Sequence, residues 1–289
     1  MGSVPIEHGG REPHLCGGAR QGGREVSAQR LRSLIGLALL GCAWPAAAVT
    51  IHIAGDSTAA DYAADRYPQS GWGQFLGCAL DGSVTVRNHA VGGRSTRTFI
   101  GEKRLDRIKA EIGAGDTLLI QFGHNDANTV KIERYADPLG AYRSNLARMI
   151  AVARSTGAQP VLITPVTRRN WKNGRVVADF TPWSDSMRAL AAELRVPLID
   201  LERDSAAWVQ AAGEAGSRVY FLHHKAEERL PAFPSGIDDD THFSELGARG
   251  IAEIVARDLK ALEIPVSAHV LAARPDLKRT MPLGRAACR

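Results

Sequence analysis

A serine, an aspartate and a histidine in this 289-residue sequence have the side chains that nucleophilic catalysis requires. Ser57 follows an apolar, β-branched run that ends in Gly-Asp-Ser, and His242 lies in the acidic stretch Asp-Asp-Asp-Thr-His-Phe. Attack of a serine on an acyl carbon needs a base within hydrogen-bonding reach and a group that orients the base. His242 can be that base, and a turn could bring Asp239, three residues earlier, to the far nitrogen of its ring.

The same chemistry needs hydrogen-bond donors directed at the oxyanion of the tetrahedral intermediate. Three candidates are the backbone N–H groups of Ser57 and Gly93 and the side-chain amide of Asn125. Gly93 belongs to the block Asn-His-Ala-Val-Gly-Gly-Arg-Ser, and Asn125 belongs to Gly-His-Asn-Asp. Because adjacent glycines let backbone N–H groups approach a ligand closely, both blocks fit an oxyanion-binding role.

Each of these blocks, taken alone, also fits a purely structural role. Ser57 could cap the next helix, paired glycines usually form a turn, and Asn-Asp commonly forms Asx-turns. His124 could be a satisfied polar residue, and the acidic stretch could be a solvated loop or part of a cation site. Catalysis is favoured because all four blocks occur in one chain, in an order that fits a single cleft.

The blocks follow segments whose residue patterns predict the strands of a parallel sheet. Strands are expected within residues 49–58 and at 83–88, 116–122, 160–164 and 196–201. Helices are expected at 72–80, 105–112, 138–156, 182–194 and 244–262. Strands that alternate with helices imply right-handed crossovers, and so predict a three-layer α/β/α sandwich with a five-stranded parallel sheet. Ligands bind at the carboxyl ends of the strands in such a sheet.

The sequence predicts one catalytic domain over residues 49–263, followed by a tail at 264–289. The tail is rich in Pro and Arg and is expected to pack loosely. The net charge of +5 is mild and the basic residues are scattered, so binding to nucleic acid has little support. The helix at 138–156 should bury one apolar face, which comprises Leu139, Tyr142, Leu146, Met149, Ile150 and Ala153.

Residues 1–48 contain the three parts of a secretory signal peptide behind an unusually long leading stretch. A basic flank at 30–32 precedes an apolar run at 34–43, and the alanines at 46–48 offer a cleavage site. The apolar run is too short to span a bilayer, so no stable membrane insertion is expected after processing. We therefore expect export to the periplasm or the extracellular space, with translation beginning nearer Val26.

The cysteines leave two questions open. The segment Leu-Leu-Gly that ends in Cys42 resembles a bacterial lipobox, so lipidation is an alternative to cleavage after Ala48. After that cleavage Cys78 and Cys288 remain, and they can either form a disulfide or stay as a buried thiol and a tail thiol. The sequence has no Cys-x-x-Cys pair, so nothing in it predicts a structural zinc site.

The order Gly-Asp-Ser, Gly, Gly-His-Asn-Asp and Asp-x-x-His resembles the GDSL or SGNH hydrolase superfamily. The longer blocks resemble its rhamnogalacturonan acetylesterase branch: Ala-Gly-Asp-Ser-Thr, Gly-Trp-Gly-Gln, Asn-His-Ala-Val-Gly-Gly-Arg-Ser-Thr-Arg-Thr-Phe, Gln-Phe-Gly-His-Asn-Asp and Asp-Asp-Asp-Thr-His-Phe-Ser-Glu-Leu-Gly-Ala. The likeness spans about residues 49–262. It implies a serine esterase that removes acetyl groups from a plant cell-wall polysaccharide, without a metal or organic cofactor.

By this resemblance Ser57 is the nucleophile, Asp239 and His242 complete the triad, and Gly93 and Asn125 complete the oxyanion hole. Gly93 is preferred to the preceding glycine because it stands directly before Arg-Ser, as in the family's Gly-Arg-Ser. The Asp-x-x-His spacing selects Asp239 from the three consecutive aspartates. Two further aspartates, Asp56 and Asp126, are expected to hold their loops through Asx bonds.

The expected substrate is an acetylated acidic polysaccharide such as acetylated rhamnogalacturonan or pectin. The loop at 167–180 follows the fourth strand and should overhang the cleft, with an Asn-Gly turn at its tip. Arginines suit carboxylated sugars and a tryptophan can stack on a sugar ring, although both could simply be surface and packing residues. The candidate substrate residues are Arg94, Arg168, Arg169 and Trp171. Alternatives are a xylan acetylesterase, a small-ester or lipid esterase, or a non-catalytic carbohydrate-binding protein.

Overall fold

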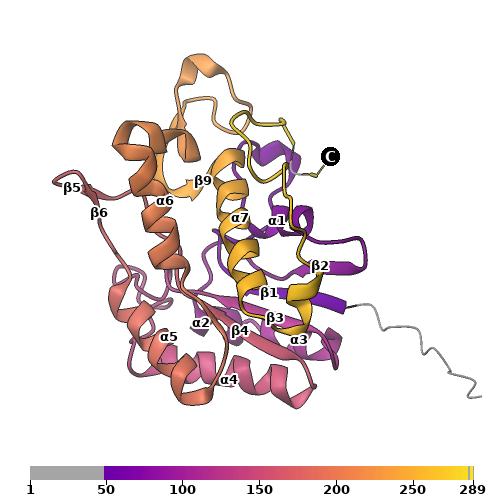
Figure 1. Ribbon diagram of the computed structural model, residues 1–289. Coiled ribbons are helices and arrows are strands. Elements are labelled where there is room, and N and C mark those ends of the chain that lie inside the picture. The colour runs from indigo at the N-terminus through magenta and orange to yellow at the C-terminus, as the bar shows by residue number, and fades with distance from the viewer. Residues whose placement is uncertain (1–48, 286, 289) are drawn as a thin grey trace, which may run out of the picture. The chain divides into compact units, whose positions relative to one another are not determined.

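Five parallel strands form the central sheet of the protein (Figure 1). The computed structural model describes residues 49–285 and 287–288, so the predicted signal segment and Cys42 lie outside the described residues. The spatial order of the strands is β2-β1-β3-β4-β7, and every neighbouring pair is parallel. The predicted five-stranded parallel sheet is confirmed, with strands β1 (Val49–Gly55), β2 (Val84–Asn88), β3 (Thr117–Gln121), β4 (Gln159–Ile163) and β7 (Leu198–Ile199).

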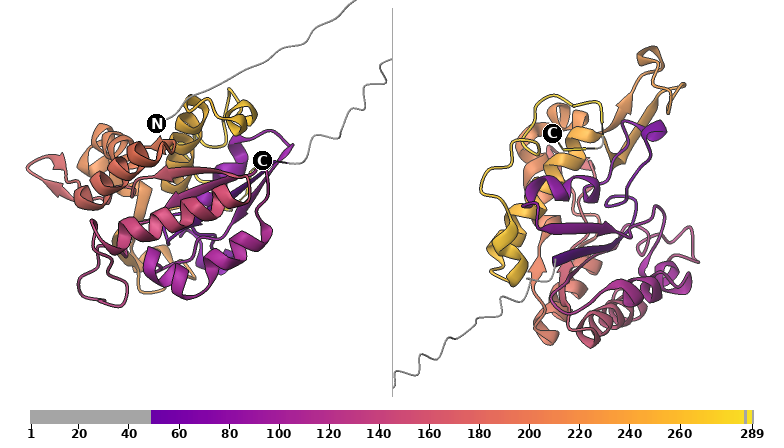
Figure 2. Two further views of the ribbon diagram at one scale, coloured as in Figure 1. Left: turned by 90° about the horizontal axis from the view of Figure 1, so that it is seen from below. Right: turned by 90° about the vertical axis from the view of Figure 1, so that its right-hand side faces the viewer.

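Helices cover both faces of this sheet, as a three-layer α/β/α sandwich requires (Figures 1 and 2). Alternate strand residues point to opposite faces, so Ile53 packs in one apolar cluster and Ala54 packs in the other. The first cluster lies under α1 (Gly73–Leu76), α6 (Leu201–Gly216) and α7 (Glu245–Ala261). The second lies under α2 (Thr96–Gly101), α3 (Arg104–Glu111), α4 (Ala141–Ser155) and α5 (Thr181–Leu194).

Two hairpins stand outside the sheet. The first joins β5 (Trp171–Lys172) to β6 (Arg175–Val176) through the predicted Asn-Gly turn, in which Asn173 and Gly174 have φ values of 53° and 71°. The second joins β8 (Phe221–His224) to β9 (Ile237–Phe243), and it was not predicted because its residues are mostly polar. Short 3₁₀ helices occupy Ala64–Arg66, Gly77–Ala79, Ser217–Tyr220, Ala226–Glu228 and Pro265–His269.

Two predictions about helices need correction. Leu139 is 79% exposed and precedes α4, because Asp137 accepts hydrogen bonds from the backbone N–H groups of Leu139 and Gly140 in a turn before the helix. The other five residues predicted for this buried face are buried. Helix α6 was not predicted, since the apolar residues at 196–201 were all assigned to a strand and the structure begins the helix at Leu201. Among the described residues, no helix has the length and apolar character needed to cross a bilayer.

The segment after α7 does not pack loosely, which corrects the prediction for residues 264–289. Val266, Val270 and Leu277 are buried in the same cluster as α7, and a disulfide joins Cys288 to Cys78. Arg249 on α7 is fully buried, and its guanidinium forms an ion pair of 2.8 Å with the buried carboxylate of Glu245. The same guanidinium donates hydrogen bonds to the backbone carbonyls of Asp276, Arg285 and Ala287.

Replacing Arg249 by methionine should lower the free energy of unfolding by about 3–5 kcal/mol, because the buried Glu245 charge would lose its partner. Arg257→Met is the matched control on the same helix, since the Arg257 side chain is 54% exposed and its partner Asp204 also pairs with Arg203 at 2.6 Å. We expect a loss below about 1 kcal/mol for the control. Urea unfolding of both variants measures the difference, and equal losses would contradict a central role for the buried pair.

Candidate active site

Ser57 is held in a tight turn at the carboxyl end of β1. Gly55 permits the close packing there, because a Cβ atom at this position would lie 3.2 Å from the Gln121 carbonyl oxygen. In the turn, Oδ1 of Asp56 accepts hydrogen bonds from the Thr58 backbone N–H at 2.9 Å and the Thr58 hydroxyl at 2.8 Å. These bonds form the Asx-type turn predicted for Asp56. The Ser57 side chain therefore lies at the edge of the sheet rather than capping a helix.

Ser57, His242 and Asp239 form a continuous chain of hydrogen bonds. The Ser57 Oγ lies 3.0 Å from Nε2 of His242, and Nδ1 of the same ring lies 2.7 Å from Oδ2 of Asp239. Burial alone would raise the pKa of the Asp239 carboxyl, but hydrogen bonds from His242 and Thr241 lower it to about 2. The ionised carboxylate can only accept, so the ring hydrogen is on Nδ1 and the Nε2 lone pair faces the serine hydroxyl. This arrangement can take the serine proton.

Strand β9 separates Asp239 from its two acidic neighbours. Asp238 contacts Nδ1 of His223 on β8, and the Asp240 carboxylate lies 2.8 Å from Nε2 of the same ring. Asp238 also pairs with Arg218 at 3.0 Å. Alternation along the strand thus directs Asp239 to the histidine of the triad and its neighbours to other cationic or imidazole partners.

Two loops from neighbouring strands complete the site. Gly92 and Gly93 follow β2, and a Cβ atom built on Gly92 would lie only 3.6 Å from Cβ of Ser57. Asn125 follows β3 and donates from its side-chain amide to the backbone carbonyl of Arg94 at 3.2 Å. Ser57 and Asn125 are each 8% exposed, so both side chains are nearly enclosed. The structure therefore brings all five predicted catalytic positions to the carboxyl edge of the sheet.

Arg134, which the sequence did not single out, holds the Asn125 amide. Its Nη1 donates a hydrogen bond of 3.2 Å to Oδ1 of Asn125, and the guanidinium lies 3.3–3.4 Å from the position of a Cβ atom on Gly93. Because the amide oxygen is engaged by Arg134, the amide nitrogen must face the opposite way. No sequence signal marks Arg134, since it lies in a polar loop among other charged residues.

Two polar residues beside Asn125 are buried and serve the loop structure. His124 donates from Nε2 to the carbonyl of Val166 at 2.7 Å, and burial together with the nearby positive charge of Arg168 lowers its pKa to about 3. Asp126 accepts from the backbone N–H and the hydroxyl of Thr96, at 2.9 and 2.6 Å. Burial raises the Asp126 pKa to about 7. These bonds join its loop to the first residue of α2 instead of forming the local Asx bond expected for Asp126.

A family model described as GDSL-like lipase/acylhydrolase matches residues 51–255, which include the whole hydrogen-bonded chain from Ser57 to Asp239. The chain belongs to this family. Two proteins of Bacillus subtilis (strain 168) are similar over most of their length. The probable rhamnogalacturonan acetylesterase YesY is 42% identical over 224 residues, which cover 78% of this chain and 98% of that protein. The rhamnogalacturonan acetylesterase RhgT is 40% identical over 224 residues, covering 77% and 94%.

Solved structures have the same fold as this GDSL-like hydrolase. The crystal structure of protein YXIM from Bacillus subtilis aligns with a TM-score of 0.65 and 27% identity, covering 77% of this chain. This chain spans 59% of the length of that protein. The acetylxylan esterase Axe2 from Geobacillus stearothermophilus aligns with a TM-score of 0.51 and 14% identity, covering 78% of this chain and 97% of Axe2. The likeness to Axe2 concerns the fold alone.

Three of the four predicted substrate residues have contacts within the GDSL-like hydrolase itself. Arg169 pairs with Asp240 at 3.1 Å, donates to a backbone carbonyl of α6, and has a side chain only 10% exposed. Trp171 packs against the apolar cluster under α6 and α7, so it stabilises the β5–β6 hairpin. Arg94 pairs with Glu102 and donates to the Gly92 carbonyl at 2.8 Å, which fixes the glycine loop.

Arg168, the fourth predicted substrate residue, lines a cavity next to the loop that carries Asn125. Its guanidinium lies 5.0 Å from the centre of the Phe180 ring. The cavity has a volume of about 360 Å³, and its lining also includes His124, Asn128, Asp179 and Trp183. Because His124 directly precedes Asn125, the cavity adjoins the site at the sheet edge.

Gly93→Ala should destabilise the protein, whereas Gly92→Ala should not. Gly93 has a φ of +78°, which costs an L-residue roughly 1–2 kcal/mol, and its new methyl group would press on Arg134. Gly92 lies outside that backbone region, so its replacement should leave the free energy of unfolding unchanged or raise it by less than about 1 kcal/mol. Denaturant unfolding of the two variants tests the difference, and equal effects would mean that the loop readily changes conformation.

Proposed function

We propose that this GDSL-like hydrolase is a serine esterase that removes O-acetyl groups from acetylated rhamnogalacturonan or a related pectin. The observation that carries the proposal is the hydrogen-bonded chain from Ser57 through His242 to Asp239, with Asn125 across the same edge. The two relatives that are about 40% identical and bear the name rhamnogalacturonan acetylesterase support the substrate.

The reaction proceeds in two steps through an acetyl-serine. His242 takes the proton of Ser57 while the serine oxygen forms a bond to the acetyl carbonyl carbon. The oxyanion is stabilised by the N–H groups of Ser57 and Gly93 and by the amide of Asn125. Arg134 fixes the orientation of that amide through its hydrogen bond to the amide oxygen. His242 then protonates the departing sugar oxygen. A water molecule, deprotonated by His242, attacks the acetyl-serine, releases acetate and restores the serine.

Two arginines favour an acidic polysaccharide over a neutral one. Arg134 brings a guanidinium next to the glycine loop and Asn125, and Arg168 brings another to the adjoining cavity. A guanidinium binds a carboxylate through two parallel hydrogen bonds, which is the recognition that a galacturonate residue offers. The carboxylates of the substrate would thus help to place its acetyl groups at Ser57.

Acetate release from a panel of acetylated polymers tests the reaction and the substrate together. We expect release from acetylated rhamnogalacturonan to exceed release from acetylated xylan and from long-chain esters. Ser57→Ala should reduce turnover to the level left by binding and the oxyanion hole, on the order of 10³-fold above the uncatalysed reaction.

The same panel distinguishes the alternatives. A clear preference for xylan or for long-chain esters would contradict the proposed substrate but keep the esterase. Near-normal turnover by a folded Ser57→Ala protein would remove the serine from the mechanism. Polysaccharide binding without any acetate release would indicate a carbohydrate-binding protein.

Asp239→Asn should lower kcat/KM less than His242→Ala, because the imidazole is the base and the carboxylate only orients it. The Asp239 carboxyl has a pKa of about 2, so it is ionised throughout the working range and accepts from the ring in the wild type. The measurement is kcat/KM of the wild type and both variants on the same acetylated substrate. Equal losses in the two variants, or near-normal turnover by a folded His242→Ala protein, would exclude His242 as the base.

We further propose that the enzyme is exported. The signal-like pattern before residue 49 supports this, and so does the Cys78–Cys288 disulfide, since disulfides persist mainly in oxidising compartments. Mass spectrometry of the protein recovered from the periplasm and the medium should find a new N-terminus near Val49. A lipid-modified N-terminal Cys42 would indicate an anchored lipoprotein, and an intact N-terminus in the cytoplasm would contradict export.

A further inference from the structure

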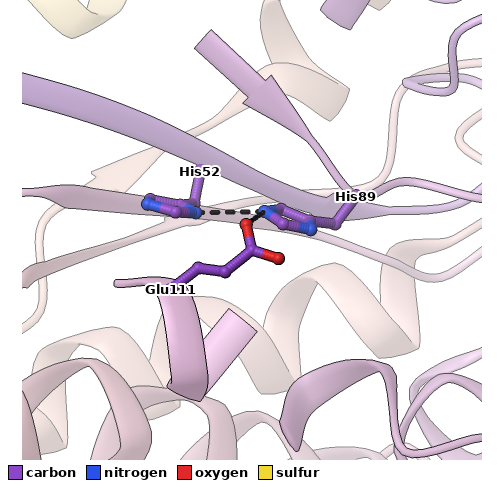
Figure 3. A group of neighbouring side chains, drawn as sticks. All are labelled: His52, His89 and Glu111. Atoms are coloured by element: carbon purple, nitrogen blue, oxygen red, sulfur yellow. Dashed lines mark hydrogen bonds and ion pairs between the residues drawn. The ribbon is translucent and has the colours of Figure 1, made fainter. Parts of the chain in front are cut away.

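Two histidines and a glutamate meet on the sheet face that α3 covers (Figure 3). His52 lies in β1, His89 directly follows β2, and Glu111 is the last residue of α3. Parallel pairing of His52 with Arg87 places His89, two residues later, on the same face of the sheet. His52 Nδ1 lies 3.0 Å from His89 Nε2, and that nitrogen lies 4.0 Å from a Glu111 carboxylate oxygen. The proposed esterase mechanism uses none of these residues.

We propose that His52 Nδ1, His89 Nε2 and the Glu111 carboxylate form a binding site for a divalent transition-metal ion of the zinc type. Two imidazoles and one carboxylate are a ligand set that zinc accepts, with a fourth position open to water. The three ligand atoms all lie within 4.8 Å of one another. Ligands of a tetrahedral zinc ion are about 3.3 Å apart, so the two ring nitrogens must separate slightly from 3.0 Å and the Glu111 carboxylate must approach from 4.0 Å.

A fixed carboxylate behind His52 prepares that ring for a metal. Asp116 Oδ2 lies 3.6 Å from His52 Nε2, and Asp116 is held by the backbone N–H groups of Thr50 and Gly113 at 2.9 and 2.8 Å. The negative charge favours the tautomer that carries its hydrogen on Nε2, which leaves the Nδ1 lone pair directed at His89. His52 is 1% exposed and its Nε2 forms no hydrogen bond. The Asp116 carboxylate can therefore accept a hydrogen bond from Nε2 when a metal binds to Nδ1.

The metal would replace the hydrogen bond between the two rings. His89 now donates from Nε2 to His52 Nδ1, and metal binding requires its hydrogen to move to Nδ1. The His89 side chain is 18% exposed and that of Glu111 is 40% exposed, so an ion can reach the site from solvent.

Positively charged side chains surround the proposed metal site and should weaken the binding of a cation there. Arg87 pairs with Glu111 at 2.9 Å, and Arg104 and Arg107 line a cavity of about 180 Å³ with His89. A bound ion must therefore displace Arg87 from the Glu111 carboxylate. Removing the Arg87 charge should strengthen metal binding, whereas removing a ligand should weaken it.

The experiment uses full-length, tag-free protein that has been treated with a chelator and dialysed. Calorimetric titration and thermal unfolding with zinc chloride should give one bound ion per chain. The Tm should rise by about 5–10 °C when free zinc is about 100-fold above the Kd. Magnesium and calcium, which prefer oxygen ligands, should leave the Tm unchanged. No zinc-dependent rise, or an equal rise with calcium, would overturn the proposal.

Variants identify the ligands without relying on buried His52. His89→Ala and Glu111→Gln should each weaken zinc binding at least about tenfold, as the loss of one of three ligands implies. His269→Ala is the matched control, because His269 also pairs with a carboxylate, that of Asp81, at the surface. It should bind zinc as the wild type does. Equal binding by the wild type and both ligand variants would locate the ion elsewhere and overturn the site.

Arg87→Gln gives a result that simple loss of structure cannot produce. Its zinc affinity should increase about two- to fivefold, which corresponds to the energy of the surface ion pair that it releases. The unfolding temperature without zinc checks that the variant is folded. An unchanged or lower affinity would contradict Glu111 as the third ligand.

Discussion

The hydrogen bond between His242 and Ser57 joins residues that are 185 positions apart, and the arrangement of the site depends on it. Ser57 is fixed by the central sheet, but His242 comes from a hairpin outside it. Two contacts bring the hairpin to the sheet edge. The carbonyl of Phe243 accepts a hydrogen bond of 3.1 Å from the Ser70 backbone, and Ser244 begins α7 by accepting from the Gly247 N–H. His242 is therefore positioned by the backbone hydrogen bond between Phe243 and Ser70 and by the start of α7 at Ser244.

The pKa values of three carboxyl groups near this bond are shifted in different directions for physical reasons. Asp56 and Asp126 are fully buried and bonded only to neutral threonine groups, so burial raises the pKa of each. Asp239 is less buried and receives an imidazole hydrogen bond, which lowers its pKa. Asp239 is therefore ionised, and it directs its negative charge at the ring that must become positive during proton transfer.

Sequence predicted the parts of the site that depend on local chain geometry. The turn after β1, the glycines after β2 and Asn125 after β3 all follow apolar strands, and parallel strands end at a common edge. The β8–β9 hairpin could not be predicted, since its residues are mostly polar and lack the apolar alternation of a half-buried strand. Arg134 was missed because it lies in a polar loop among other charged residues. The contacts of Arg169 with Asp240 and of Trp171 with the apolar cluster could not be predicted either, because they depend on tertiary packing. The role of both residues in substrate binding stays a prediction.

The closure of the segment after α7 over Arg249 affects the order of events during synthesis. The guanidinium is enclosed by carbonyl groups near residues 276–287, and the disulfide partner of Cys78 is residue 288. All of these are made after the sheet and its helices. A nascent chain that has finished α7 still lacks the groups that satisfy this buried charge, so the native state cannot be reached until the last segment emerges. Such a delay leaves the sheet and its helices short of their native state until synthesis is almost complete.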